Sequence, residues 1–256
     1  MSMQFNDTST FKGIIQIIEK ELGLEREYIS GNSNKLKETT ADVNLAWDDY
    51  AYIALKAMGW EWDDSNFTDY PIIKTNIVSG QRDYTFTTDE GGNLILDIYK
   101  VLVLSSATAT VYDQIEPVNQ QGGGDEVYDL EAENTTQGTP VQYDKTANGI
   151  FLDPIPSYNA TNGLKVYINR EPSYFVSTDT TKKPGCPGIH HRYFALKAAL
   201  DYARRNSLSV YNRLREEVVS FEGDEEKNLV GSIERYFARR SKDEEFAFTN
   251  RPISYR

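Results

Sequence analysis

The sequence predicts an α+β fold in which a four-helix bundle is interrupted by a β-rich insertion. Apolar residues recur at helical spacing towards both ends of the chain, whereas alternating and short apolar runs fill the middle, and Gly and Pro cluster where the pattern changes. We therefore expect a first helical half, an inserted β-rich domain, a second helical half and an extended C-terminal tail. Their expected boundaries are 1–69, 70–176, 177–245 and 246–256.

Two helices are predicted in the first helical half. The first covers about 10–22, where apolar residues repeat every three or four positions and Gly23 can end the helix. The second covers about 36–58, and Gly59 is placed to be its C-cap. The apolar positions that predict the two helices are Phe11, Ile14, Ile15, Ile18 and Leu22, then Val43, Trp47, Tyr50, Ala54 and Ala57.

The middle of the chain carries strand patterns. Residues 83–87 alternate between polar and apolar side chains, and 94–104 form an apolar run dense enough for a buried strand. Asn148-Gly149 is a strong hairpin turn. Further short strands are expected around 141–143, 150–152 and 164–168.

Two more helices are predicted after a linker rich in Gly and Pro at 177–188. They cover about 189–206 and 209–243, again with apolar residues three and four positions apart. Gly223 and Gly231 lie inside the second range and are expected to bend or break it. The four helices can then form one bundle.

The chain is strongly acidic and rich in tyrosine. Its net charge is −12, from 39 acidic and 27 basic residues. A nucleic-acid reader is expected to show a basic face, so this balance argues against tight phosphate binding, although a local patch could still exist. An acidic wall would instead repel DNA and let it slide past. The 17 tyrosines suit large contact surfaces.

Cysteine usage and hydropathy indicate a protein made in the cytoplasm. Cys186 is the only cysteine, so no disulfide can form within the chain, which suits a reducing compartment. No apolar stretch approaches the roughly 18 residues of a membrane helix. Residues 1–10 are polar and lack the apolar core of a signal peptide. We therefore expect no membrane partner and no secretion.

Each candidate for chemistry has a simpler structural explanation. His190 and His191 are adjacent, so on a helix they point about 100° apart and cannot converge on one metal as an i, i+4 pair would. Cys186 lies between a glycine and a proline, without a known nucleophile signature. Residues 122–124 are three glycines that lack the Lys-Ser/Thr of a phosphate loop. We therefore predict no catalytic residue, no cofactor and no metal, and a protein that is not an enzyme.

Two features keep other function classes open. Acidic pairs such as Asp63 and Asp64 are the residue type that a glycosidase needs, although in a chain with 39 acids a solvated surface explains them better. Trp60 and Trp62 could stack on a sugar or base, although core packing at the helix–sheet junction explains them better. A cell-wall (peptidoglycan) hydrolase and a carbohydrate-binding module remain as alternatives.

Arginines are prominent in the predicted C-terminal helices, where they alternate with glutamates. Ion pairs between helices or between subunits explain this alternation better than DNA readout does. The arginines are Arg204, Arg205, Arg213, Arg215, Arg235, Arg239 and Arg240.

Three segments, taken in order, carry a resemblance to a known family. The first is the helix that ends at 45–58 and runs into Gly-Trp-Glu-Trp at 59–62. The second is a Gly-x-Pro segment with a strand at 138–143, an apolar strand ending in Pro-x-Pro at 150–156, and a strand ending near Arg-x-Pro at 164–172. The third is the Ala-rich helix at 193–203. In this order the segments resemble the head-to-tail adaptor (connector) proteins of tailed bacteriophages.

The resemblance implies a structural virion protein at the head-tail junction, made in the host cytoplasm. Members of this family form a ring, usually a dodecamer, beneath the portal protein. The ring continues the DNA channel used in genome packaging and DNA ejection, and it receives the tail proteins of the nozzle or tube. The resemblance thus implies portal, tail proteins and further copies of the chain as partners, with DNA passing through the lumen without specific binding. Another virion ring or a tail-terminator protein is the alternative within this class.

The expected C-terminal tail, 246–256, carries the candidate partner-binding residues. Phe246, Phe248, Ile253 and Tyr255 are apolar or aromatic, and Pro252 forbids a regular helix through them. So short a segment cannot bury these four side chains by itself. We therefore expect them to dock on portal or on a neighbouring subunit.

Overall fold

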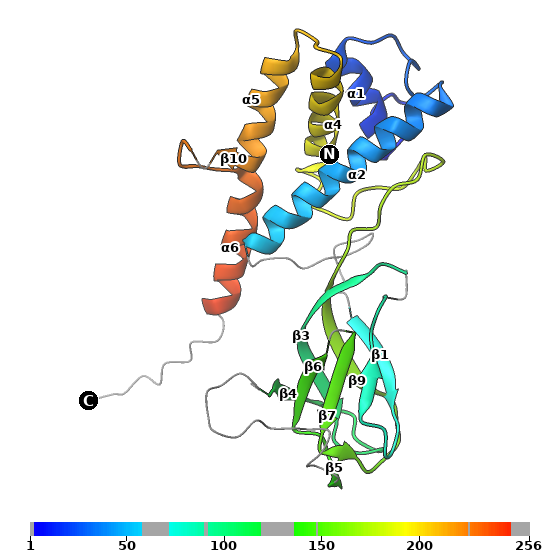
Figure 1. The fold of residues 1–256 in the computed structure, drawn as a ribbon, viewed down its shortest axis with the longest axis vertical. Coiled ribbons are helices and arrows are strands. Elements are labelled where there is room, and N and C mark those ends of the chain that lie inside the picture. The colour runs from blue at the N-terminus through cyan, green and yellow to red at the C-terminus, as the bar shows by residue number, and fades with distance from the viewer. Residues whose placement is uncertain are drawn as a thin grey trace, which may run out of the picture. The chain divides into compact units, whose positions relative to one another are not determined.

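The structure is a computed structural model, and contacts divide the chain into two compact units (Figure 1). The helical unit consists of Met1–Phe67 and Pro172–Arg256, and the β unit is Thr68–Glu171. The side chains of 240–246 are not described. The residues that the structure describes are 3–57, 72–89, 92–118, 136–146, 148–224 and 226–246.

The expected four-helix bundle with a small β-rich insertion is wrong. The described part of the helical unit contains five helices, and the β unit holds a large curled sheet of seven strands (Figure 1). The expected helix at 209–243 is two helices, because a short hairpin of β10 (Gly223–Asp224) and β11 (Leu229–Val230) separates them. The helices are α1 (Ile14–Leu22), α2 (Ser33–Lys56), α4 (His191–Arg205), α5 (Tyr211–Glu222) and α6 (Ser232–Phe246).

Two glycines explain why the chain leaves the helix after α5. Gly223 has a φ of 96°, a conformation that residues with a side chain rarely adopt. A Cβ on Gly231 would lie 2.1 Å from the carbonyl oxygen of Phe221, so only glycine fits where the hairpin closes on the end of α5. Both glycines were expected to weaken the helix, but the pairing of the chain as strands between them was not predicted.

Helix α4 lies at the centre of the helical unit and packs against α1, α2 and α5 (Figure 1). Its inward positions include alanines that are fully buried, and such small side chains let the neighbouring helices approach closely. Aromatic rings fill the space towards α2. The ring centroids of Trp47 and Phe194 lie 4.2 Å apart, and those of Tyr50 and Phe194 lie 5.4 Å apart. The buried alanines of α4 are Ala195, Ala198, Ala199 and Ala203.

A buried carboxylate holds the loop between α1 and α2. Oε1 of Glu19, which is 3% exposed, accepts hydrogen bonds from the backbone N–H groups of Ile29 at 2.8 Å and Ser30 at 2.9 Å. The loop then leads into α2, whose N-terminus is capped by Asn32. The Glu19 carboxylate therefore supplies acceptors for backbone N–H groups that have no secondary-structure partner in this loop.

The sheet of the β unit has the strand order β1-β9-β3-β4-β6-β7-β2. It is mixed, because β4 and β6 are parallel whereas the other neighbours are antiparallel. Register shifts in β1 and β3 mark bulges, which bend strands and favour the curl. Its strands are β1 (Ile72–Ile77), β2 (Asp83–Thr85), β3 (Ile95–Leu104), β4 (Tyr112–Pro117), β6 (Gln142–Thr146), β7 (Gly149–Asp153) and β9 (Ala160–Arg170).

The concave side of this sheet encloses its own apolar core, which includes Val101, Leu152 and Val166, all fully buried. A separate parallel pair joins β5 (Gln137–Gly138) to β8 (Ile155–Pro156). The β unit therefore has a core of its own, distinct from the core of the helical unit.

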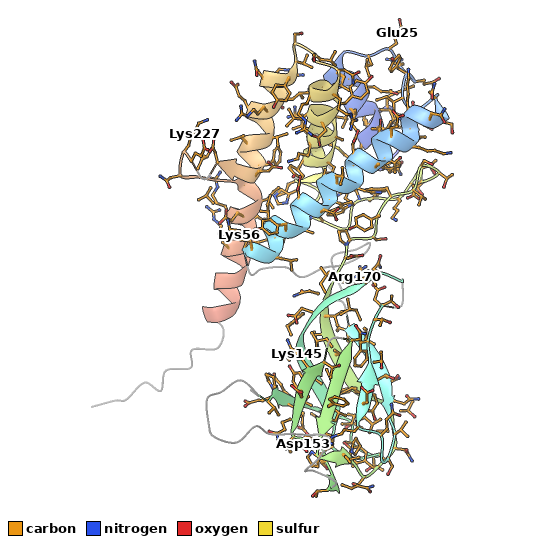
Figure 2. All side chains as sticks on the ribbon, viewed as in Figure 1. Glu25, Lys56, Lys145, Asp153, Arg170 and Lys227 are labelled. Atoms are coloured by element: carbon orange, nitrogen blue, oxygen red, sulfur yellow. The ribbon has the colours of Figure 1, made fainter. Side chains whose placement is uncertain are left out.

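Two buried charged side chains of the described β unit, Arg170 and Asp153, which Figure 2 labels, each lie beside an opposite charge. Nη1 of Arg170 lies 3.1 Å from Oδ2 of Asp89, and the side chain of Arg170 is almost fully buried. Asp153 lies 3.8 Å from the guanidinium of Arg82 and also accepts a 2.6 Å hydrogen bond from Nε2 of Gln142. Removing one partner would leave an uncompensated buried charge, so these pairs fix the strands that carry them.

Replacing Glu19 tests the role of its carboxylate in the helical unit. Glu19→Gln keeps the size of the side chain but removes one acceptor oxygen and directs an amide donor at backbone N–H groups. We expect the free energy of unfolding to fall by about 1–3 kcal/mol. Chemical denaturation of the full chain followed by circular dichroism measures this change. Glu25→Gln, at an exposed position of the same loop, is the matched control, and equal unfolding midpoints for the two variants would contradict the assignment.

Candidate functional site

The predicted partner-binding residues fall mostly beyond what the structure describes. Phe246 is the last residue of α6, and its side chain is not among those described. Phe248, Ile253 and Tyr255 lie outside the described residues, so their docking stays a prediction. The same holds for Trp60 with Trp62, for the acidic pair at 63–64 and for the glycine run at 122–124.

The two adjacent histidines bind different partners. His190 lies at the N-terminal end of α4 and its Nδ1 is 2.8 Å from the hydroxyl of Tyr50 on α2. Nδ1 of His191 accepts a 2.9 Å hydrogen bond from the backbone N–H of Met3, and its Nε2 lies 2.9 Å from the carbonyl oxygen of Cys186. Both imidazoles therefore connect segments that are distant in the sequence.

Burial keeps these histidines neutral. Desolvation, with a smaller contribution from neighbouring His191, lowers the pKa of His190 to about 4. Desolvation also lowers the pKa of His191, although its hydrogen bond to the Cys186 carbonyl opposes this. A neutral, hydrogen-bonded imidazole of this kind is typical of a structural residue.

Cys186 has the properties of a structural cysteine. Its side chain is buried, and desolvation raises the pKa of its thiol well above the ordinary value. The thiolate is the reactive form of cysteine, so a raised pKa makes this residue a poor nucleophile near neutral pH. The residue therefore contributes packing rather than chemistry.

Lys197 of α4 forms ion pairs with one acid on α5 and one on α2. Nζ of Lys197 lies 2.6 Å from Oε1 of Glu222 and 3.0 Å from Oδ2 of Asp49. The hydroxyl of Tyr193 donates a 2.7 Å hydrogen bond to the same Glu222 oxygen. Desolvation lowers the pKa of Lys197, but the hydrogen bonds to Glu222 and Asp49 outweigh it and raise the pKa overall. Lys197 thus forms ion pairs with one acid on α2 and one on α5, an arrangement that links α2, α4 and α5.

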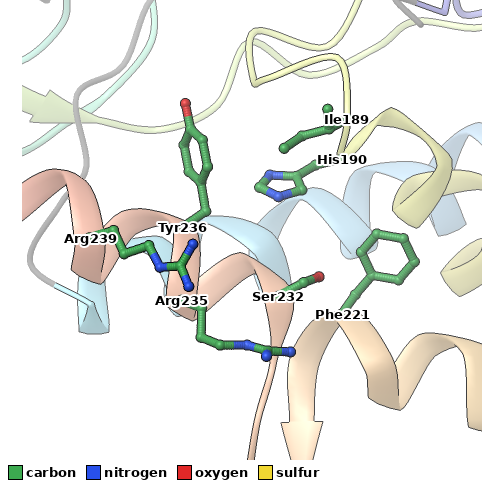
Figure 3. A pocket seen from close by; sticks show the side chains of 7 residues that line it. All are labelled: Ile189, His190, Phe221, Ser232, Arg235, Tyr236 and Arg239. Carbon is green, nitrogen blue, oxygen red and sulfur yellow. The ribbon is translucent and has the colours of Figure 1, made fainter.

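A cleft of about 610 Å³ lies where the start of α4 meets the end of α5 and one face of α6 (Figure 3). Four of its residues recur along α6 at intervals of three, one and three positions, which places them on one helical face. The hairpin at β10 and β11 precedes this face and determines where α6 begins. The residues that line the cleft are Ile189, His190, Phe221, Ser232, Arg235, Tyr236 and Arg239.

The walls of this cleft are aromatic and aliphatic. The rings of His190 and Tyr236 meet edge to face with centroids 5.2 Å apart (Figure 3). Ile189 is 65% exposed, an unusual position for a large aliphatic side chain. Figure 3 shows Ile189 and His190 reaching the hollow from one side and Tyr236 with Arg239 from α6. The cleft can therefore take an apolar side chain.

Two arginines flank the cleft without carboxylate partners among the described residues. Arg235 and Arg239 are exposed, and the guanidinium of Arg235 donates from Nε to the carbonyl oxygen of Gly231 at 3.3 Å. Several other arginines of the helical unit have carboxylate partners: Arg205 binds Asp42, and Arg213 binds Glu21 at 2.8 Å. We call the lining residues with these two arginines the Arg235–Arg239 cleft. It is suited to a segment that carries both an apolar side chain and a carboxylate.

Sequence reasoning missed this cleft. Its lining residues come from three separate places, at 189–190, at 221 and at 232–239. The available signal was the spacing of Arg235, Tyr236 and Arg239 on one face of a helix that begins just after Gly231.

The described residues show neither a metal site nor a membrane helix, and known protein families and curated proteins give no match. Within the described residues, no three His, Cys, Asp or Glu side chains are grouped as a metal site. No helix in the described segments is long and apolar enough to cross a bilayer. No model of a known protein family matches the chain, and no curated protein matches it either.

The buried His190 predicts how stability depends on pH. Its folded-state pKa of about 4 lies below the ordinary value of 6.5, so the unfolded chain binds a proton more readily. Stability is therefore complete above pH 6.5 and is lost as pH falls towards 4. This single group contributes a loss of about 2 kcal/mol between pH 7.5 and pH 5.

Urea denaturation across this pH range measures the loss. His190→Gln removes the titrating group while keeping an oxygen that can accept a hydrogen bond from Tyr50. We expect the variant to be less stable at pH 7.5 but to have a shallower pH dependence than the parent chain. The same slope in both proteins would show that His190 does not titrate on unfolding.

Proposed function

We propose that the chain is a structural virion protein, a head-to-tail adaptor whose copies form a ring that joins portal to tail and continues the DNA channel. The observation that carries the proposal is the Arg235–Arg239 cleft, an apolar hollow flanked by two arginines that have no carboxylate partner among the described residues. Such a surface is typical of docking between proteins. The ordered resemblance to adaptor proteins supports it from the sequence side.

The chemistry of the described residues favours docking over catalysis. The groups that could act in a reaction are the two histidines, the cysteine and the acids beside α5. The imidazoles are hydrogen-bonded and neutral, the Cys186 thiol has a raised pKa, and Lys197 forms ion pairs with Glu222 and Asp49. Each group has a packing role that accounts for its geometry.

Charge gives the cleft a role in assembly. Copies with a net charge of −12 repel one another, so a ring needs local contacts between opposite charges. Arg235 and Arg239 can supply the positive side of such a contact, and acidic segments of a neighbouring copy or of portal can supply the negative side. We propose that free protein stays monomeric and that portal acts as the template on which the ring closes.

The C-terminal tail has a complementary part in this proposal. Phe246 ends α6, the helix that carries the arginines of the cleft, and Phe248, Ile253 and Tyr255 follow it in the sequence. In this proposal the tail docks on portal, and the cleft, which lies on the helix just before the tail, docks on portal or on a neighbouring copy.

Reversing a charge in the cleft tests the proposal. Arg235→Glu places a carboxylate beside the hollow, where it repels an acidic partner. We expect the affinity for purified portal, measured by biolayer interferometry, to fall at least about tenfold, and rings seen by sedimentation of the mixture to disappear.

Arg215→Glu is the matched control, because Arg215 is an exposed arginine on neighbouring α5 that does not line the cleft. It should bind portal like the parent chain. If Arg235→Glu binds portal and forms rings as well as this control does, the cleft is not the docking site. If the parent chain does not bind portal at all, the adaptor proposal itself fails.

A further inference from the structure

Lysines and tyrosines gather on the face of the β unit that is turned away from its apolar core. On β9 the residues Leu164, Val166 and Ile168 are buried in that core, so the alternating residues Lys165 and Tyr167 belong to the opposite face. Residues directly opposite one another on neighbouring strands share a face. We call the set the lysine–tyrosine face; its members are Lys74, Tyr99, Lys100, Tyr112, Lys165 and Tyr167.

The strand register places two positive charges side by side. Lys74 on β1 lies directly opposite Lys165 on β9. Like charges at opposed positions destabilise a sheet, so this pairing costs stability that a bound anion would restore. Lys100 lies on the other neighbour of β9, opposite Tyr167. The three lysines therefore span three adjacent strands.

Tyrosine rings lie under the lysine head groups. Nζ of Lys165 is 4.2 Å from the ring centroid of Tyr112, and Nζ of Lys100 is 5.3 Å from that of Tyr167. The hydroxyl of Tyr112 donates a 2.6 Å hydrogen bond to the carbonyl oxygen of Asn162, which fixes the ring. These cation–π contacts hold the lysines in place without neutralising them.

A bulge in β3 adds a third ring to the face. The register passes from Ile98 opposite Ile168 to Lys100 opposite Tyr167, so Tyr99 is the extra residue. A bulge of this kind redirects a side chain. The ring of Tyr99 meets Tyr167 edge to face at 6.1 Å, and it is 42% exposed. The face thus offers an aromatic surface to solvent.

The three lysines form no ion pair with any described residue. Other lysines of this acidic chain are paired, for example Lys145 with Asp97 at 3.0 Å and Lys227 with Asp224 at 3.1 Å. Glu116 on β4 follows the buried Ile115, so alternation puts it on the same side of the sheet, but it makes no ion pair with these lysines. The lysine–tyrosine face therefore keeps a local positive charge.

We propose that the lysine–tyrosine face binds single-stranded nucleic acid. Lysines contact phosphates, and an exposed aromatic ring such as that of Tyr99 stacks on a base. A duplex offers phosphates but hides the faces of its bases, so the exposed ring of Tyr99 selects the single-stranded form. The inference goes beyond the proposed adaptor function, in which DNA passes without specific binding, and it does not depend on that function.

The test is fluorescence anisotropy of the full chain with a fluorescein-labelled oligothymidylate of about twenty nucleotides. We expect weak, salt-sensitive binding, because the chain as a whole is acidic. Three phosphate contacts predict that log K falls with log salt with a slope of about −2. Lys100→Gln and Lys165→Gln should each weaken binding about threefold or more and make this slope shallower.

Tyr99→Leu separates stacking from charge. It should weaken binding of the oligonucleotide several-fold while leaving the salt slope unchanged, since it removes a ring and no charge. Lys37→Gln, at an exposed position of α2, is the matched control and should bind like the parent chain. Circular dichroism of each variant checks that its fold is retained.

Three results would overturn the inference. The first is no binding of the oligonucleotide at low salt. The second is binding that Lys100→Gln and Lys165→Gln weaken no more than Lys37→Gln does. The third is equal competition by a duplex of the same length or by polyglutamate, with no effect of Tyr99→Leu, which would make the face a general anion site.

Discussion

The hydrogen bond between the Tyr50 hydroxyl and Nδ1 of His190 is the polar contact on which the helical unit depends. Both residues are buried, and the contact joins α2 to the segment that enters α4 from the β unit. Around it pack Phe194 of α4 and Phe237 of α6, with ring centroids 5.4 Å and 6.0 Å from that of Tyr50. An imidazole in such a place must stay neutral, which is why its pKa is low. The same ring forms a wall of the Arg235–Arg239 cleft, so packing and docking depend on one residue.

Charge is distributed unevenly over an acidic chain. Several described acids are paired with nearby cations, whereas the arginines of the cleft and the lysines of the lysine–tyrosine face make no ion pair with described residues. In both places the cations lie beside apolar or aromatic side chains, which lowers the cost of binding an anion there because less water must be removed. Under our two proposals, the chain repels polyanions through its net charge of −12 and binds anionic segments at these two places. This combination suits a protein that must assemble with others around a nucleic-acid channel.

Local patterns in the sequence located secondary structure better than they predicted its assembly. Apolar spacing identified helical segments near α1, α2 and α4, and Gly223 with Gly231 marked the weak point of the last predicted helix. The bundle was wrong because the last predicted helix is broken there into two helices by a hairpin. The small insertion was wrong because strands far apart in the sequence, such as β1 and β9, pair within one seven-stranded sheet. Neither the pairing of the strands nor the curl of the sheet is encoded in a local sequence pattern, because both depend on contacts between residues far apart in the chain. The cleft was missed for the same reason, and the partner-binding residues of the tail lie outside the described residues.

The central claim is that this chain is a docking protein of a larger assembly, and that the Arg235–Arg239 cleft is where it docks. Electron cryomicroscopy of purified chain mixed with purified portal tests it most directly. The account predicts a ring beneath the portal in which an acidic segment of the next copy or of portal fills the cleft, with a carboxylate within about 4 Å of Arg235 or Arg239. A ring whose clefts all face solvent, or no complex with portal, would contradict it.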